Sequence, residues 1–252
     1  MRIGILRSAV FFVLLTALWA ILSKANIWDA TMFPSPLQVA RTLWDGLKDG
    51  TLLIATGTSL RRVLLGYGIS LLVGVPLGIA LARSKFLDDT VGALVNGLQA
   101  LPSICWLPLA LLWFGLNDRA ILFVVVMGAV LAITISVQDG VKNIPPVYLR
   151  AAKTMGVRPF SFYTEVLLPA SLPSLLTGAK LGWSFAWRAL MSGELLFVSL
   201  GLGHQLMMGR ELADMSQVIA VMLVIIAIGL LVDRAIFGVL EKQVRERWGL
   251  EG

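Results

Sequence analysis

Long apolar stretches separated by short polar segments run along the whole chain. An apolar helix needs about 20 residues to cross the hydrocarbon core of a bilayer. Several stretches approach that length once flanking Ser, Thr and Gln residues are included. We therefore predict an all-α membrane protein with six transmembrane helices. The expected spans cover about residues 8–23, 54–83, 91–116, 120–137, 170–200 and 217–237.

Proline and glycine modify the second and third stretches. Pro102 and Pro108 fall within the third stretch. Because proline lacks an N–H donor and kinks or breaks a helix, we expect an interrupted span there. Gly74 and Gly78 lie four residues apart in the second stretch. Small residues let helices approach closely in lipid, so this pair favours a helix contact without specifying its partner.

The composition is typical of a membrane protein and excludes an ordinary soluble domain. Of 252 residues, 58% are hydrophobic and 14% are charged, and the mean hydropathy is +0.85. Soluble domains carry about 25% charged residues. We interpret residues 1–252 as one transmembrane domain surrounded by lipid. The net charge of +6 does not indicate a nucleic-acid partner, because the basic residues flank apolar runs and form no single patch.

The distribution of Lys and Arg predicts the orientation. Six spans place both termini on one side, and cytoplasmic segments carry the excess of basic residues. If both termini are cytoplasmic, that side carries twelve Lys and Arg residues and the outer side carries seven. The first apolar run follows Arg2 and Arg7 and also fits a signal peptide ending near Ala25. We favour an uncleaved anchor.

A polar segment at residues 145–168 separates the fourth and fifth stretches. Pro145 and Pro146 prevent a helix from continuing out of the fourth stretch, and a helix can restart after them. Residues 147–155 contain no Gly or Pro and include two adjacent alanines, which favour a short helix. Gly156 is placed to end this helix in a left-handed conformation.

A second short helix is expected after that turn. Pro159 suits its first turn, and Pro169 and Pro173 are expected to punctuate the return to the membrane. The first helix has small residues on one side, so it can enter a groove on a partner protein. The alternative is an ordinary amphipathic loop between two spans.

Residues 150–169 read RAAKTMGVRPFSFYTEVLLP. This spacing resembles the cytoplasmic loop of the membrane subunits of binding-protein-dependent ABC importers, whose pattern is Glu-Ala-Ala, three residues, Gly, nine residues and Ile-x-Leu-Pro. The chain departs from the pattern in having Arg150 in place of Glu and Val166 in place of Ile. In that family the loop docks onto a separate ATPase chain. The resemblance assigns this coupling role to Arg150, Ala151, Ala152, Gly156, Leu168 and Pro169.

The resemblance implies a type I ABC importer permease fold in a bacterial inner membrane. It implies a homodimer of the permease, two ATPase subunits, and a periplasmic or lipid-anchored solute-binding protein. The chain has no GxxxxGK[ST] motif, so ATP and Mg²⁺ are expected on the partner ATPase and the chain itself is not expected to be an enzyme. We expect no cofactor. We also expect no metal site, because the single His204 has no cluster of Cys or carboxylates around it in the sequence.

A second resemblance narrows the class of solute that the protein is expected to transport. Residues 102–115 read PSICWLPLALLWFG and look like the third span of permeases that import sulfonates, taurine, nitrate and related small anions. An importer permease for another small solute, such as a vitamin precursor, is one alternative. An ATP-independent channel or carrier is another. A membrane enzyme would need a cluster of acids, histidines or metal ligands, which the sequence does not show.

Polar residues within the spans are candidates for the translocation pathway. A charged side chain within a span costs about 2.5–3.5 kcal/mol on insertion scales, which draws attention to Arg188 and Glu194 in the fifth stretch. Arg188 suits an anion in the pathway or a structural ion pair equally well. For Glu194 we favour a structural role. Arg61 and Arg62 at the outer mouth suit either an anion funnel or contact with lipid headgroups, and we favour the headgroup contact. Helical spacing predicts one polar stripe from Asn96, Gln99 and Ser103, which suits a water-filled pathway or hydrogen bonds between helices about equally well.

Overall fold

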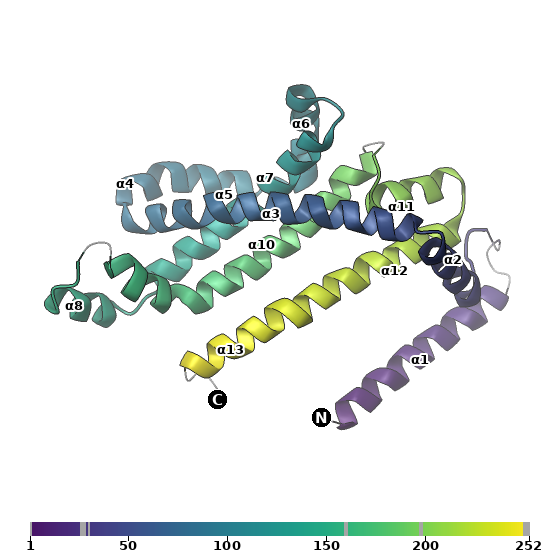
Figure 1. Ribbon diagram of the computed structural model, residues 1–252, viewed down its shortest axis with the longest axis horizontal. Coiled ribbons are helices and arrows are strands. Elements are labelled where there is room, and N and C mark those ends of the chain that lie inside the picture. Colours follow the sequence, from purple (N-terminus) through teal and green to yellow (C-terminus); the bar gives the residue numbers. More distant parts are fainter. Residues whose placement is uncertain (1, 26–28, 30, 159–160, 197–198, 249–252) are drawn as a thin grey trace. The chain divides into compact units, whose positions relative to one another are not determined.

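The computed structural model describes residues 2–25, 29, 31–158, 161–196 and 199–248 (Figure 1). Every regular element in this part of the chain is a helix, which confirms the all-α class. The α-helices are α1 (Arg2–Lys24), α2 (Pro36–Lys48), α3 (Thr51–Arg83), α4 (Lys85–Leu87), α5 (Ala93–Gln99), α6 (Leu107–Phe114), α7 (Asp118–Lys142), α8 (Pro146–Thr154), α10 (Leu168–Leu196), α11 (Leu202–Glu211), α12 (Met215–Val232) and α13 (Gly238–Trp248). Three π-helical segments, η1 (Asp88–Gly92), η3 (Phe162–Leu167) and η4 (Asp233–Phe237), and one 3-10 segment, η2 (Ser103–Trp106), join them.

Three helices in the described part of the chain are long and apolar enough to cross a membrane. They run over Thr51–Arg83, Asp118–Lys142 and Met215–Arg247, and coincide with the second, fourth and sixth expected stretches. A fourth candidate is a pair of helices, Lys85–Gln99 and Ser103–Phe114, bent by 104° at the break between them. The apolar part of α1, Ala9–Lys24, is shorter. The count of six spans therefore stays a prediction.

The chain divides into two compact units. One contains residues 1–59 and 198–227, and the other contains residues 60–197 and 228–252. In the first unit, Ser35 caps α2 in a capping box: its hydroxyl accepts the Gln38 N–H, and its own N–H donates to the Gln38 side chain.

The second unit is built around α7, whose buried face extends over most of its length. Helix α10 lies beside it (Figure 1). A Cβ on Gly182 of α10 would lie 2.4 Å from Ile133 Cγ1 of α7. A Cβ on Gly78 of α3 would lie 2.6 Å from the Thr134 carbonyl oxygen. These approaches require glycine, and they confirm the close helix contact expected from Gly74 and Gly78.

The bend in the third apolar stretch occurs at Pro102. Helix α5 ends at Gln99, and the chain continues as η2 from Ser103, so the interruption expected there is confirmed. Pro108 does not break the chain a second time, because it occupies the first turn of α6, where an N–H is not needed. Pro173 likewise lies inside α10, so the expected punctuation at this residue is wrong.

Candidate functional site

Helix α8 and the turn after it match the structure predicted for the start of residues 145–168, which we call the coupling segment. Helix α8 begins at Pro146, and Gly156 has a φ of +68°. The N–H of Val157 donates to the Ala152 carbonyl oxygen over 3.2 Å. A left-handed glycine followed by this backbone bond is a Schellman cap, which confirms the conformation expected at Gly156. Pro159 lies outside the described residues.

A groove of about 620 Å³ lies between α8, η3 and the start of α10. Tyr148 of α8 and Met155, which follows the helix, contribute large, exposed apolar side chains to it. Of the coupling residues expected from the sequence, three line this groove, Arg150 is exposed beside them, and Leu168 begins α10. The complete lining is Pro145, Tyr148, Ala151, Ala152, Met155, Val157, Glu165, Val166, Pro169 and Ala170.

A second cavity, of about 290 Å³, brings together three of the five residues expected in the pathway. Gln99 comes from the end of α5, Ser103 from the start of η2, and Arg188 from α10. The close approach of α7 explains why these elements meet, because a Cβ on Gly128 would lie 2.7 Å from Ala189 Cβ and 3.4 Å from Ser103 Cβ. The other lining residues are Ala100, Leu101, Pro102, Trp106, Met127, Gly128, Leu131 and Phe185.

Arg188 is held in this cavity by its own helix. Its Nε donates to the Ser184 carbonyl oxygen over 3.1 Å, and its guanidinium carbon lies 4.7 Å from the centre of the Phe185 ring. No Asp or Glu in the described part of the chain forms an ion pair with it. A cation fixed by a backbone carbonyl and an aromatic face, without a carboxylate, suits an anionic ligand.

The remaining two pathway candidates lie elsewhere. Asn96 does not line the cavity; its Nδ2 donates to the Gly92 carbonyl oxygen over 3.0 Å. The expected stripe of Asn96, Gln99 and Ser103 is wrong as a helical face, because the helix ends at Gln99 and the chain bends before Ser103.

Glu194 is part of a buried ion pair. Its side chain has no exposed surface, and its Oε1 lies 2.9 Å from Nη1 of Arg62. The other terminal nitrogen of Arg62 lies 2.6 Å from Oδ1 of Asp118. Arg62 is only 5% exposed, so the expected contact with lipid headgroups is wrong. A buried carboxylate requires a cation. The presence of Glu194 within an apolar stretch was therefore the one signal in the sequence from which a pairing with Arg62 could have been predicted.

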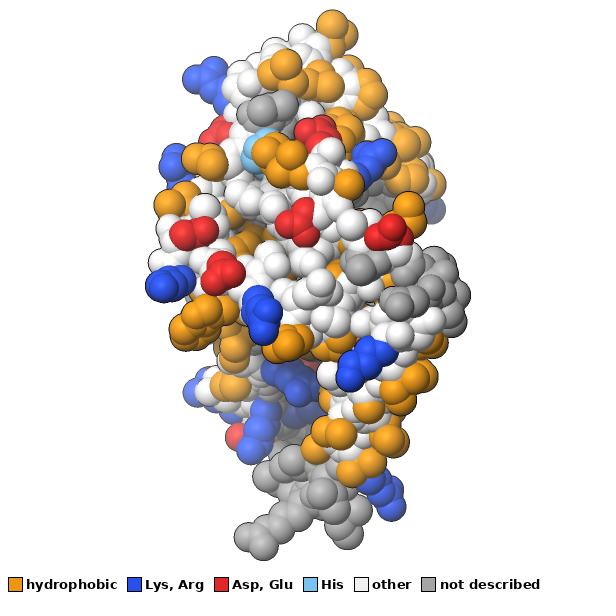
Figure 2. All heavy atoms as spheres, turned by 90° about the vertical axis from the view of Figure 1, so that its right-hand side faces the viewer, with side chains coloured by type: hydrophobic (Ala, Val, Ile, Leu, Met, Phe, Trp, Pro, Cys, Tyr) orange, Lys and Arg blue, Asp and Glu red, His pale blue; other side chains and the backbone are white. Residues whose placement is uncertain are grey.

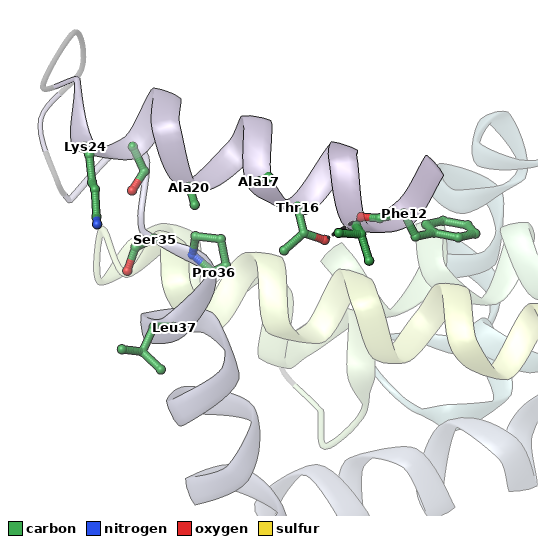
Figure 3. Close-up of a pocket in the computed structure, with 10 residues that line it drawn as sticks. Phe12, Thr16, Ala17, Ala20, Lys24, Ser35, Pro36 and Leu37 are labelled. Carbon is green, nitrogen blue, oxygen red and sulfur yellow. Dashed lines mark hydrogen bonds between the residues drawn. The ribbon is translucent and has the colours of Figure 1, made fainter. Parts of the chain in front are cut away.

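A third hollow, of about 660 Å³, lies between α1 and α2 in the first unit (Figure 3). Its lining is largely apolar, with Lys24 near one end and Thr16 farther along. On the face shown in Figure 2, Lys and Arg side chains are interspersed with acidic and apolar ones. Neither feature gathers polar groups around a cation as the Arg188 cavity does.

Comparison with known proteins identifies the family. Residues 74–246 match the family described as binding-protein-dependent transport system inner membrane component, and the chain belongs to it. The chain is 36% identical over 191 residues to a Methanocaldococcus jannaschii protein assigned as an ABC transporter permease, covering 75% of this chain and 72% of that one. The chain is thus the membrane permease of an ABC importer.

The names of other relatives specify a solute. The nitrate import permease protein NrtB of Synechocystis is 27% identical over 92% of this chain and 86% of its own. The taurine transport system permease protein TauC of Escherichia coli is 29% identical over 88% of this chain and 82% of its own. The fold is similar to that of the MetNI methionine ABC transporter in an inward-facing conformation, with a TM-score of 0.69 and 20% identity over 77% of this chain and 96% of that one.

Proposed function

We propose that this permease imports a small oxyanion, such as nitrate, taurine or an aliphatic sulfonate, and that Arg188 contacts the anion during passage. The observation that carries the proposal is the Arg188 cavity, in which a guanidinium without a carboxylate partner in the described chain lies with Gln99 and Ser103. The names of two relatives, which specify nitrate and taurine, support the same class of solute.

The chemistry of the cavity fits that class. Guanidinium is planar and permanently charged, and it donates parallel hydrogen bonds to two oxygens of one anion. The Gln99 amide and the Ser103 hydroxyl supply neutral donors in the same cavity. Binding through one cation and two neutral groups is weak enough to allow release, which a transport site requires.

The groove on α8 supports a docking site for a partner subunit. We propose that an ATPase subunit docks there, through Ala151, Ala152 and Pro169 of the groove lining and through Arg150 beside it. Two permease chains and two such ATPases would form the transporter, with ATP and Mg²⁺ bound by the ATPases and the solute delivered by a binding protein. In the orientation that puts α8 in the cytoplasm, both termini are also cytoplasmic. The membrane that the protein crosses is then the inner membrane of a bacterium.

The test is transport by variants of Arg188 in proteoliposomes that contain the assembled importer, with labelled nitrate and taurine as probes. Arg188→Gln should reduce uptake per complex by about tenfold or more, because the cation is lost. Arg188→Lys keeps the charge and loses the planar fork, so its uptake should be intermediate. Arg61→Gln removes an exposed arginine of α3 and serves as the matched control. Unchanged uptake per complex in Arg188→Gln would remove Arg188 from the pathway.

A further inference from the structure

Four elements surround the Arg188 cavity, α5, η2, α7 and α10, and the last two are continuous with the coupling segment. Helix α7 contributes Leu131 and leads directly into α8, and α10 contributes Arg188 and directly follows η3. A movement of α8 and η3 therefore reaches these two walls along the chain itself. The remaining wall, formed by α5 with Gln99 at its end and by η2 after it, has no such connection, because α5 follows η1. It must be linked to the coupling segment through a side-chain contact or packing.

The η1 segment is attached to the end of α7 by one carboxylate. Oδ2 of Asp88, the first residue of η1, accepts from Nζ of Lys142 over 2.6 Å. Its Oδ1 accepts from Nε2 of Gln138, which is 4% exposed. Lys142 is the last residue of α7, and α8 begins four residues later at Pro146. The contact therefore lies at the base of the coupling helix.

Apolar packing continues this connection toward the cavity. Val95 of α5 belongs to one buried cluster with Val130 and Leu131 of α7 and Leu81 of α3. Leu131 also lines the cavity. Packed side chains transmit displacement because protein interiors are dense and resist compression. Two contacts therefore join this part of the chain to α7: Asp88 attaches η1, and Val95 of the buried cluster attaches α5.

We infer that Asp88 is the positioning residue that makes η1 and α5 move with α7 when the ATPase displaces the coupling segment. The inference rests on the proposed function, in which α8 docks the ATPase. The ion pair is partly exposed, with 40% of the Lys142 side chain and 30% of the Asp88 side chain accessible. Such pairs contribute little to stability, so their loss should leave the fold intact. The orientation of α5 depends on them more directly, since Asp88 accepts from two residues of α7 at once.

The experiment follows α5 without needing the transported solute. A cysteine replaces Gly97 of α5, an exposed position where a Cβ meets nothing within 4 Å. The exposed Cys105 is replaced by alanine. The labelling rate with a water-soluble maleimide is then measured on the assembled permease–ATPase complex with and without ATP. With Asp88 present, ATP should change the rate by about tenfold, within the range of known coupling effects. With Asp88→Asn, the two rates should agree within about twofold.

Two variants separate this role from a general effect of charge. Asp89→Asn removes an exposed carboxylate one residue away that forms no ion pair in the described chain, and it should keep the response to ATP. Exchange of the pair, Asp88→Lys with Lys142→Asp, should restore part of the response. A full response in Asp88→Asn, or the absence of a response when Asp88 is present, would overturn the inference. Failure of the complex to retain its ATPase would instead overturn the proposed function, and the inference with it.

Discussion

The buried ion pair between Arg62 and Glu194 gives the most quantitative prediction. Arg62→Met would remove the cation beside a carboxylate that has no exposed surface. Loss of one partner from a buried pair costs about 3–5 kcal/mol, because the other charge stays buried. For a chain of this size, each kcal/mol lowers the unfolding midpoint by about 2–4 °C. We therefore expect the midpoint of Arg62→Met to fall by on the order of 10 °C.

The two carboxylates around Arg62 provide matched comparisons. The Asp118 side chain is 55% exposed, and an exposed pair contributes at most about 1 kcal/mol, so Asp118→Asn should have a small effect. Glu194→Met should be intermediate, because Arg62 keeps Asp118 at 2.6 Å. The double variant Arg62→Met with Glu194→Met removes both buried charges, and it should be less destabilised than the sum of the single variants.

The assay is thermal unfolding of the purified permease in detergent, followed by tryptophan fluorescence; the chain contains eight Trp residues. The order of the unfolding midpoints shows whether the Arg62–Glu194 pair stabilises the fold. If Arg62→Met falls no further than Asp118→Asn, or if the double variant equals the sum of the single ones, the pair does not stabilise the fold as the geometry indicates.

Two further predictions concern the coupling segment and the orientation. Gly156→Val should reduce retention of the ATPase on affinity purification, because a β-branched residue strains the left-handed turn, whereas Gly156→Asn tolerates that conformation and should retain it; equal retention by the two variants would contradict the role of the turn. A reporter active only outside the cytoplasm should be silent when fused after Gly252 and active when inserted after Leu212, in the turn that follows α11; the reverse pattern would invert the orientation.

Local features of the chain were predictable because they depend on neighbouring residues. The helix after Pro145, the left-handed Gly156 and the break near Pro102 each follow from the conformational limits of Pro and Gly. The bend of 104° at that break was not predictable, because a proline interrupts a helix without fixing the direction of the next segment. The bend explains why Ser103 does not continue the face of α5 that carries Asn96 and Gln99.

Contacts between distant segments could not be predicted from local patterns. Arg62 and Glu194 are 132 residues apart, and Asp88 and Lys142 are 54 apart. Sequence indicated that a buried acid needs a cation, but the second apolar stretch offers both Arg61 and Arg62. Only the packing of α3 against α7 and α10 decides which arginine is buried. The meeting of Gln99, Ser103 and Arg188 in one cavity likewise could not be predicted, since it depends on how closely α7 approaches α10.

We propose that this chain forms the pathway of an ATP-driven importer of small anions. The most direct measurement is uptake of labelled nitrate and taurine into proteoliposomes that contain the permease, its ATPase and its binding protein, with and without ATP. We predict accumulation of one of these anions with ATP and none without it. Equal uptake in the absence of ATP, or transport of neither anion by a complex that hydrolyses ATP, would contradict this function.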